Sequence, residues 1–444
     1  MSVIQLASNA VIAKLYNAPR EAKLLVSEAL SYHVEGAEHT AAFKSGNWNG
    51  RSSFFDFAQG TFPAGFVYFV HERLTQAGFT VQLVRKPIPP ALGPENPKVD
   101  DFGFDPKYDY QMETVRRLVR YGRMIAQVAT GGGKSRIAKL AFARIRRPTL
   151  FLTTRGVLMY QMKESIEATT NLQVGVIGDG EFSPRKGFTV AMVQTIAARL
   201  QMPDIEREYA ELKKRERDRI YEAEKKGLAY EPASLERLRD EAKAIVERKL
   251  RERQKMIKIL EYFEFVIGEE AHEAGGNSYY EILRHCKNAH YRLALTATPF
   301  MRADAESNMR LMACFGQIGI RISEKMLIDR GILATPYFKY IRTPKPAKLY
   351  RTTPWQRAYQ VGIVENIERN KAIVIEAARA VSHGLPVMIL VQHKKHGNLL
   401  KKLIAERTRA TVEFIYGEHE QKDRKAALKR LASGKTQILI GSTI

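Results

Sequence analysis

The stretch Ala-Thr-Gly-Gly-Gly-Lys-Ser at residues 129–135 follows a mainly apolar run, residues 124–128, and precedes a helix-forming stretch, residues 136–146. A strand, a glycine loop and a helix in this order are typical of a phosphate-binding loop, because backbone N–H groups and the helix dipole converge on an anion. An ordinary glycine-rich turn is the alternative, since Ala129 stands where the strict motif has glycine. The residues predicted to bind a nucleoside triphosphate are Thr130, Gly131, Gly132, Gly133, Lys134 on the β- and γ-phosphates, and Ser135 on magnesium.

The length and composition indicate an ordinary globular protein. The chain has 444 residues, of which 45% are hydrophobic and 27% are charged, so we expect two to four domains. No apolar run approaches the length of a membrane span, and the N-terminus lacks a basic-then-apolar leader pattern. Cys286 and Cys314 are the only cysteines, which excludes a disulfide framework and a cysteine zinc site. We therefore expect a cytoplasmic protein without membrane contact.

The charge of the chain predicts a polyanionic partner. Lysine and arginine number 71 against 48 acidic residues, which gives a net charge of +23 and an isoelectric point near 9.8. Such an excess is typical of nucleic-acid-binding proteins. Anionic lipid is the competing interpretation, but no segment joins a large apolar face to a basic one.

The chain divides into several regions by pattern. Residues 1–95 indicate a small mixed α/β domain that binds nucleic acid, and residues 96–106 an irregular, proline-rich linker. Residues 107–345 alternate strand-like and helix-like runs, which predicts a parallel sheet covered on both faces. Within them, residues 204–260 predict an inserted helical hairpin, whose dense charges are either a solvated face or a DNA-contacting arm.

A second α/β unit is predicted for residues 346–444. Because the chain ends soon after an apolar strand, we expect this sheet to have an uncovered edge and the domain to be truncated. The strands expected in the first α/β domain are 125–128, 149–153, 173–177, 189–193, 265–268 and 292–295. In the second we expect helices at 363–380, 397–406 and 422–433 and strands at 387–391, 412–416 and 437–440.

A second chemical motif lies at residues 265–272, where an apolar strand ends in Glu-Glu-Ala-His. Motor ATPases hold magnesium and orient water from such a strand end beside the phosphate loop. We predict that Glu269 binds Mg²⁺, directly or through water, and that Glu270 is the general base. His272 can link this site to Thr296-Ala297-Thr298. Surface charge is the alternative for the two carboxylates.

The ordered motifs resemble those of superfamily 2 helicases of the DEAD/H-box type. Residues 153–158 with Gln161 are similar to motif Ia, 269–272 to the DEAH box and 295–299 to motif III. Tyr110-Gln111 is similar to the adenine-side glutamine motif. The resemblance covers residues 107–444 and implies two RecA-like motor domains that use ATP and Mg²⁺. It places Gln111 at the adenine and gives His272, Thr296 and Thr298 a coupling role.

A narrower resemblance rests on residues 46–51, Gly-Asn-Trp-Asn-Gly-Arg, and on Arg369-Asn370. Together with the DEAH-like core they resemble the UvsW-type recombination helicases of T-even bacteriophages and phage relatives. That family implies an ATP-driven translocase that remodels branched DNA and R-loops in recombination, repair or replication. Two departures stand out. Glu269 replaces the usual aspartate, and the family's arginine-bearing motifs V and VI would lie after residues 441–443.

The fold predicts where nucleic acid would bind. Strand-end loops of such motors contact phosphates without reading sequence, so we expect branched or single-stranded DNA, and RNA–DNA hybrids, as partners. Each candidate is also compatible with a plain surface loop. Trp48 could stack on a base or belong to the core. His393 and His396 fit solvated loop histidines better than metal ligands. The candidate DNA contacts are Thr154, Arg155, Gly156, Gln194, Thr195, Gln392, His393, Lys394 and Trp48.

Two other functions stay open. The motor subunit of a restriction system would share these motifs, although no nuclease signature is visible. A nucleic-acid-binding or annealing module with a vestigial ATPase is the third possibility. The presence of both Lys134 and Glu270 argues against it.

Overall fold

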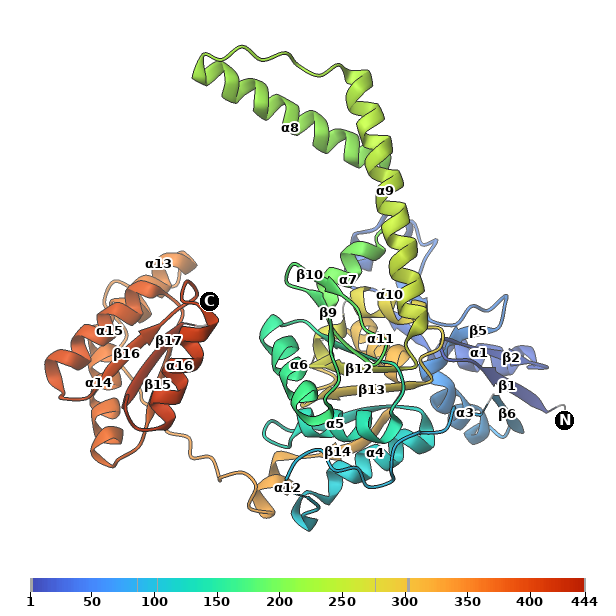
Figure 1. Cartoon of the computed structure of the whole chain (residues 1–444), viewed down its shortest axis with the longest axis horizontal. Helices are drawn as coiled ribbons and strands as arrows, with labels where there is room; N and C mark the ends of the chain where they lie inside the picture. Colours follow the sequence, from blue (N-terminus) through green and yellow to red (C-terminus); the bar gives the residue numbers. More distant parts are fainter. Residues whose placement is uncertain (1–2, 86, 102, 276, 302–303, 443–444) are drawn as a thin grey trace. The chain divides into compact units, whose positions relative to one another are not determined.

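The computed structural model describes residues 3–85, 87–101, 103–275, 277–301 and 304–442 (Figure 1). The chain forms two compact units, residues 1–335 and 336–444, which are described separately. In the described residues, the helices are all too short or too polar to traverse a lipid bilayer. Residues 443 and 444, with which we expected the missing motifs to begin, lie outside this description.

The first unit begins with a four-stranded sheet in the order β5-β2-β1-β6. Its strands are antiparallel except for the parallel pair β1 and β6. Residues 67–76 are helical, and Val67, Val70 and Leu74 recur on one face of this helix and are buried. The elements are β1 (Ile4–Ser8), β2 (Ile12–Tyr16), α1 (Arg20–Ala29), β5 (Thr61–Pro63), η2 (Ala64–Phe66), α3 (Val67–Gln76) and β6 (Val81–Arg85). A small lobe adds β3 (Ser31–His33), η1 (Ala37–His39), α2 (Ala41–Lys44) and β4 (Arg51–Ser53).

These N-terminal elements share a hydrophobic core with the sheet that follows. Phe66 and Phe62 lie in one cluster with Ala313, and Met312 and Tyr280 pack against it. Gly65 lies directly on the backbone of Met312 and Ala313, where an added Cβ would be 2.1 Å from the Met312 carbonyl oxygen. The N-terminal elements and the motor sheet therefore belong to one compact unit.

An eight-stranded sheet forms the centre of this unit, in the order β10-β9-β11-β8-β12-β13-β7-β14. All neighbours are parallel except β10 with β9. The strands are β7 (Arg123–Val128), β8 (Thr149–Thr153), β9 (Gly175–Gly178), β10 (Glu181–Ser183), β11 (Phe188–Met192), β12 (Phe265–Glu269), β13 (Tyr291–Thr296) and β14 (Ile318–Ile322). Sequence reasoning missed β10 and β14, the two edge strands, because each exposes polar residues and lacks the continuous apolar run of a buried strand.

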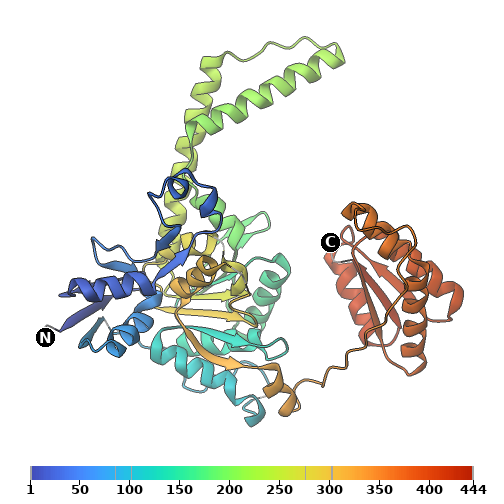
Figure 2. The ribbon, with the colours of Figure 1, turned by 180° about the vertical axis from the view of Figure 1, so that it is seen from behind.

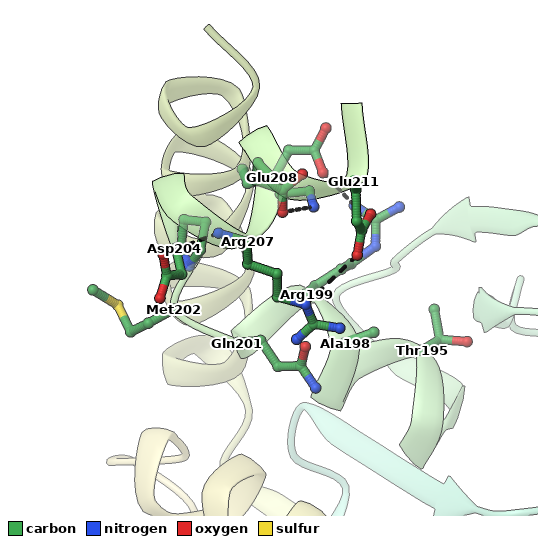
Figure 3. A pocket seen from close by; sticks show the side chains of 12 residues that line it. Thr195, Ala198, Arg199, Gln201, Met202, Asp204, Arg207, Glu208 and Glu211 are labelled. Carbon is green, nitrogen blue, oxygen red and sulfur yellow. Dashed lines mark hydrogen bonds and ion pairs between the residues drawn. The ribbon is translucent and has the colours of Figure 1, made fainter. Parts of the chain in front are cut away.

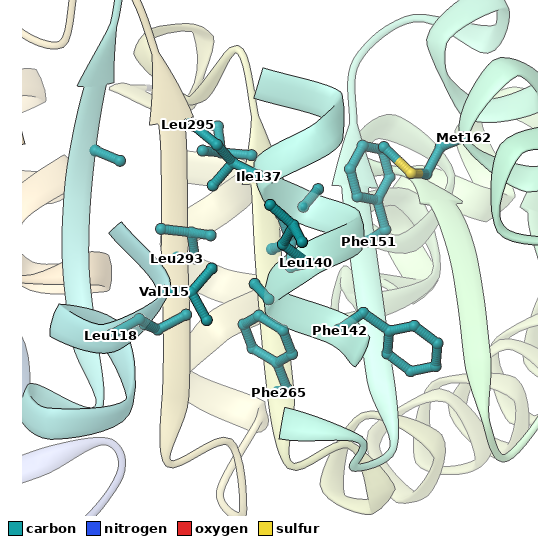
Figure 4. Close-up of a cluster of buried hydrophobic side chains, with 14 of the residues drawn as sticks. Val115, Leu118, Ile137, Leu140, Phe142, Phe151, Met162, Phe265, Leu293 and Leu295 are labelled. Atoms are coloured by element: carbon teal, nitrogen blue, oxygen red, sulfur yellow. The ribbon is translucent and has the colours of Figure 1, made fainter. Parts of the chain in front are cut away.

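Helices cover both faces of this sheet (Figures 1 and 2). Phe142, Phe151 and Phe265 belong to one face, where helices α4, α5 and α6 pack (Figure 4). Tyr279, Phe315 and Leu260 belong to the other face. The helices are η3 (Pro106–Tyr108), α4 (Asp109–Tyr121), α5 (Lys134–Ile145), α6 (Gly156–Thr170), α7 (Val193–Leu200), η4 (Ala271–Gly275), α10 (Asn277–His285), α11 (Ala305–Phe315) and α12 (Glu324–Asp329).

A long helical hairpin, α8 (Ile205–Lys226) and α9 (Leu235–Tyr262), projects from the sheet between α7 and β12 (Figure 1). Leu212, Leu238 and Ala242 hold the two helices together. At its base, acidic and basic side chains face one another around a cavity of about 380 Å³ (Figure 3). Arg199 pairs with Glu252 at 3.7 Å, and Lys249 pairs with Glu208. Much of the charge at this base is thus internally neutralised.

The second unit is a smaller parallel sheet with the order β15-β17-β16. The last described strand, β17, lies in the middle of this sheet. The edges are β15 and β16, because β17 returns between them. The elements are α13 (Trp355–Tyr359), a π-helix (Gln360–Val364), α14 (Ile367–Ser382), β15 (Val387–Val391), α15 (Lys394–Arg407), β16 (Val412–Ile415), α16 (Gln421–Ala432) and β17 (Ile438–Ser442).

Candidate functional site

The glycine loop joins the carboxyl end of β7 to the first turn of α5. Gly131 and Gly133 have φ values of +84° and +81°, which glycine adopts at little cost. Gly133 is the N-cap residue, so α5 begins at Lys134, two residues earlier than sequence predicted. The N-terminus of a twelve-residue helix thus points at the loop, as an anion site requires.

The side chain of Gln111 on α4 is buried against the glycine loop. Its side chain is 2% exposed, and its Nε2 donates to the Gly132 carbonyl at 3.3 Å. Its Oε1 accepts from the Arg136 guanidinium at 2.6 Å. Tyr110 also donates to the Gly132 carbonyl, at 3.0 Å. Gln111 therefore fixes the loop, while both ends of its amide are already engaged.

Beside Gln111 lies a cavity of about 460 Å³ that sequence reasoning did not find. It is lined in part by residues 96–100 and 103–105, which we had interpreted as part of a plain linker. Asp100 holds Arg136 with two hydrogen bonds, at 2.7 and 3.0 Å, and this contact raises the pKa of the Arg136 guanidinium. Val99 is buried in the sheet's core. No motif marks Asp100, because its partner is 36 residues away and only the fold brings the two together.

Glu269 is the last residue of β12 and is 5% exposed. Burial, and secondly the neighbouring Glu270 carboxylate, raise the pKa of Glu269 to about 7. A cation beside this buried carboxyl would stabilise its charged form and so lower its pKa.

Glu270 follows at φ +46°, a left-handed conformation that is uncommon for a residue with a side chain. This turn directs its carboxylate to the phosphate loop, where Oε1 is 2.6 Å from the Lys134 Nζ. Its Oε2 is 3.3 Å from the His272 Nδ1. The structure therefore brings together the two residues that sequence reasoning placed at the centre of the chemistry.

The next strand end carries the predicted coupling residues. His272 Nδ1 lies 2.9 Å from the Thr296 hydroxyl, which also accepts from the Thr298 backbone N–H at 3.2 Å. The strand register explains why His272 and Thr296 lie close together, since β12 and β13 are parallel neighbours with Glu269 opposite Leu295. Gln127 on β7 donates to the Ala297 carbonyl at 3.3 Å, a contact that sequence reasoning missed.

Two of the residues predicted to contact DNA in the first unit, Thr154 and Arg155, bind the acidic residue Glu273. The Thr154 hydroxyl donates to one oxygen of Glu273, and Arg155 lies 2.9 Å from the other. Burial alone would raise the pKa of Glu273, but these two hydrogen bonds outweigh it and the pKa is lowered. The Glu273 carboxylate, one residue after His272, therefore joins the motif Ia loop to the nucleotide site.

The other strand-end candidates lie nearby. Gln194 donates to the Thr154 carbonyl at 3.2 Å. Gln194 and Thr195 are not in a strand-end loop as expected, because β11 ends at Met192 and α7 begins at Val193. Gly156 opens α6 with space around its Cα. Trp48, in the N-terminal lobe, is half-buried and donates to the Arg51 carbonyl at 2.6 Å.

In the second unit, Gln392, His393 and Lys394 line one cavity of about 640 Å³. Lys394 is not a loop residue but begins α15, where it pairs with Glu418 and lies 4.4 Å from the Tyr416 ring centroid. Our prediction for His396 was wrong, because this histidine is 3% exposed in α15 rather than solvated in a loop. Its Nε2 lies 2.9 Å from the Asn370 Oδ1, and burial lowers its pKa to about 4.

The residues fit a magnesium ion that is held mainly by phosphate and water. Within the described residues, no three His, Cys, Asp or Glu side chains gather into a metal cage. Mg²⁺ in phosphoryl-transfer sites usually has one or two carboxylates together with substrate phosphates. Glu269 can supply the carboxylate, and Ser135 offers an exposed hydroxyl in the first turn of α5.

Comparisons with known proteins give a family match over part of the chain and distant structural likenesses over more of it. Residues 106–301 match the family described as "Type III restriction enzyme, res subunit". No curated protein matches the chain. Among solved structures, UvsW of bacteriophage T4 is 14% identical over 99% of this chain and 80% of its own, with a TM-score of 0.49. A second UvsW helicase structure from the same phage is 15% identical over 72% of this chain and 100% of its own, also with a TM-score of 0.49.

The Hef helicase domain of Pyrococcus furiosus is 16% identical over 75% of this chain and 85% of its own, with a TM-score of 0.42. At these identities the structural likenesses concern the fold. The chain is thus similar in part to UvsW and to the Hef helicase domain, and its first unit has a mainly parallel sheet covered by helices on both faces.

Proposed function

We propose that this chain is an ATP-dependent superfamily 2 DNA helicase or translocase that remodels branched DNA or R-loops in recombination, repair or replication. The observation that carries the proposal is the 2.6 Å pair between Lys134 of the phosphate loop and Glu270 at the end of β12. Two residues that follow separate strands, β7 and β12, meet where a γ-phosphate and its attacking water would lie.

The pair explains how ATP would engage the site. Lys134 cannot hold the β- and γ-phosphates while it is bound to Glu270, so ATP binding exchanges its partner. Glu270 then becomes available to orient and deprotonate the attacking water. Mg²⁺, bound by Ser135 and Glu269, would neutralise charge on the phosphate oxygens. The Gln111 contact keeps the Gly132 carbonyl turned away from the anion.

Hydrolysis would reach the nucleic acid through Glu273 and His272. Glu273 holds Thr154 and Arg155, and His272 joins Glu270 to Thr296. The Glu273 backbone N–H also donates to the Glu270 carbonyl at 2.9 Å, so Glu270 is two contacts away from the proposed DNA loop. In the second unit, Gln392, His393 and Lys394 are the proposed backbone contacts, and Trp48 is a stacking candidate in the N-terminal lobe.

The test is hydrolysis and remodelling by the purified full-length protein. We expect ATP turnover that requires magnesium and rises with DNA, together with displacement of strands from forked DNA or R-loops. Single-stranded DNA, forked DNA, an RNA–DNA hybrid and RNA alone should be compared at one salt concentration. Turnover that rises with RNA alone and not with DNA would contradict the proposed substrate.

A second candidate is the motor subunit of a restriction system, which the family description of residues 106–301 favours. Such a motor would move along duplex DNA without separating its strands. Displacement of a third strand from a triplex, without unwinding of the duplex, would support this candidate. The third possibility, a binding module with vestigial ATPase, is disfavoured by the paired Lys134 and Glu270.

A further inference from the structure

A cavity of about 690 Å³ lies at the end of the motor sheet away from the phosphate loop. It is lined by the second half of α4, the first residues of β7 and β14, and Tyr68 of α3. Because β7 and β14 are parallel, their amino ends share this edge, whereas the phosphate loop follows the carboxyl end of β7. The charged lining residues define what we call the arginine groove: Glu113, Arg116, Arg117, Arg120 and Arg123.

Two of these arginines have structural partners within the groove wall. Arg117 binds Glu113 at 2.7 Å and the Gly319 carbonyl at 2.7 Å. Arg123 donates to the Ala10 carbonyl at 2.9 Å. The single carboxylate of the groove is therefore already used by Arg117.

The other two arginines face solvent with little compensation. Arg116 has a 58% exposed side chain and lies 3.9 Å from Glu113, at the limit of an ion pair. Arg120 lies 5.4 Å from the Tyr121 ring centroid, and no described carboxylate lies within ion-pair distance of it. Arg116 and Arg120 are one helical turn apart, a spacing at which like charges repel. An anion between them would relieve this repulsion.

The arginine groove differs from the cavity at the base of the helical hairpin in how its basic residues are paired. There Arg199, Arg207 and Lys249 each have an acidic partner, at Glu252, Glu211 and Glu208. The arginine groove is instead lined by four arginines and one glutamate, and only Arg116 and Arg117 lie within ion-pair distance of Glu113. Guanidinium forks match the paired oxygens of a phosphate, and Tyr121 adds a 39% exposed aromatic ring.

We propose that the arginine groove binds the sugar–phosphate backbone of DNA, independently of ATP and of the strand-end loops. The DNA held there would be a second segment of the substrate, since the strand-end loops lie at the opposite edge of the sheet. This goes beyond the proposed function, because neither hydrolysis nor translocation is required for it. The binding would be insensitive to base sequence, as phosphate contacts are.

The experiment measures DNA affinity of the full chain without nucleotide. A fluorescein-labelled blunt duplex is titrated at several salt concentrations with wild type, with Arg116→Gln/Arg120→Gln and with Arg116→Lys/Arg120→Lys. Removing two phosphate contacts should reduce the slope of log affinity against log salt by roughly two, and should weaken binding by about tenfold at low salt. The lysine variant keeps the charge, so its slope should stay near that of wild type.

The matched control is Arg215→Gln/Arg251→Gln on the helical hairpin. These arginines are 68% and 72% exposed and lie 4.0 and 3.9 Å from a glutamate, so they resemble Arg116 in exposure and pairing. We expect this control to bind nearly as wild type does. An equal loss in both double variants, or an unchanged slope in Arg116→Gln/Arg120→Gln, would overturn the proposal. Thermal unfolding of each variant checks that the fold is kept, and because no ATP is present, a failure of the proposed ATPase leaves the result interpretable.

Discussion

The two ends of the eight-stranded sheet differ in how their charges are balanced. At the carboxyl end, Lys134 is paired with Glu270, and Arg155 is paired with Glu273. At the amino end, Arg116 and Arg120 have little or no acidic compensation. Where the charged side chains are already paired, a charged ligand binds only when a side chain leaves its partner. Such a site suits a step that ligand binding switches on. A site with unbalanced charge attracts a polyanion at all times, which suits steady attachment.

The largest effect is expected when Glu270, the acidic residue of the pair at the carboxyl end of the sheet, is replaced. Glu270→Gln removes the proposed base but leaves every phosphate contact in place, so turnover should fall by roughly 10²–10⁴-fold. ATP binding should be kept or tightened, because Lys134 no longer has a charged partner to leave. Single-turnover hydrolysis and fluorescent ATP binding measure the two effects.

Lys134→Ala is the matched variant from the basic side of the pair. It removes a phosphate contact and should chiefly weaken ATP binding. If Glu270→Gln turns over at the wild-type rate, the catalytic assignment of Glu270 is wrong.

The second expected effect concerns the amino end, where the N-terminal elements meet the motor sheet. Gly65→Ala would place a methyl group 2.1 Å from the Met312 carbonyl oxygen, which is backbone and cannot swing aside. We expect a loss of about 3 kcal/mol in unfolding free energy and weaker duplex binding, because Tyr68 beside it lines the arginine groove. Chemical denaturation measures the loss. Gly187→Ala, whose Cβ would approach only Leu172 at 3.8 Å, should be nearly neutral.

A smaller effect is expected where the nucleotide site joins the motif Ia loop. Glu273→Gln keeps a hydrogen-bond acceptor for Thr154 but removes the charge that holds Arg155. The ratio of DNA-stimulated to unstimulated hydrolysis should fall about fivefold or more, as expected when coupling between two sites is weakened. Glu281→Gln, which removes a surface partner of Arg284 at 3.0 Å, is the control. An unchanged ratio in Glu273→Gln would show that coupling takes another route.

The smallest effect is a pH dependence at Glu269. Its pKa of about 7 lies above the ordinary value of 4.5, so the carboxyl is mostly protonated below pH 6 and mostly charged above pH 8. A cation requires the charged form, so magnesium affinity in the presence of a non-hydrolysable ATP analogue should rise by up to roughly tenfold across this interval. Calorimetric titration measures it. Glu269→Gln should bind magnesium more weakly and without this rise; a rise of the same size in that variant would exclude Glu269 as its source.

Much of the fold followed from local pattern. The strand at 149–153 and the strand at 387–391 agree with β8 and β15 residue for residue, because their apolar runs are uninterrupted. The glycine loop and the Glu-Glu-Ala-His motif could be recognised because their chemistry is carried by neighbouring residues. The edge strands β10 and β14 could not, since a strand paired on one side only keeps polar residues.

By itself the sequence determined the class of the motor sheet and the phosphate loop, because each depends on residues close together in the chain. It also determined the excess of positive charge, which depends on composition alone. Only the tertiary structure decided which distant side chains meet. Asp100 reaches Arg136, Thr154 reaches Glu273, and His396 is buried against Asn370. It likewise decided that four arginines and a single glutamate line one cavity at the amino end of the sheet. The physical reason is that strand order and helix packing, which place these groups, depend on how the whole core is buried rather than on any local pattern.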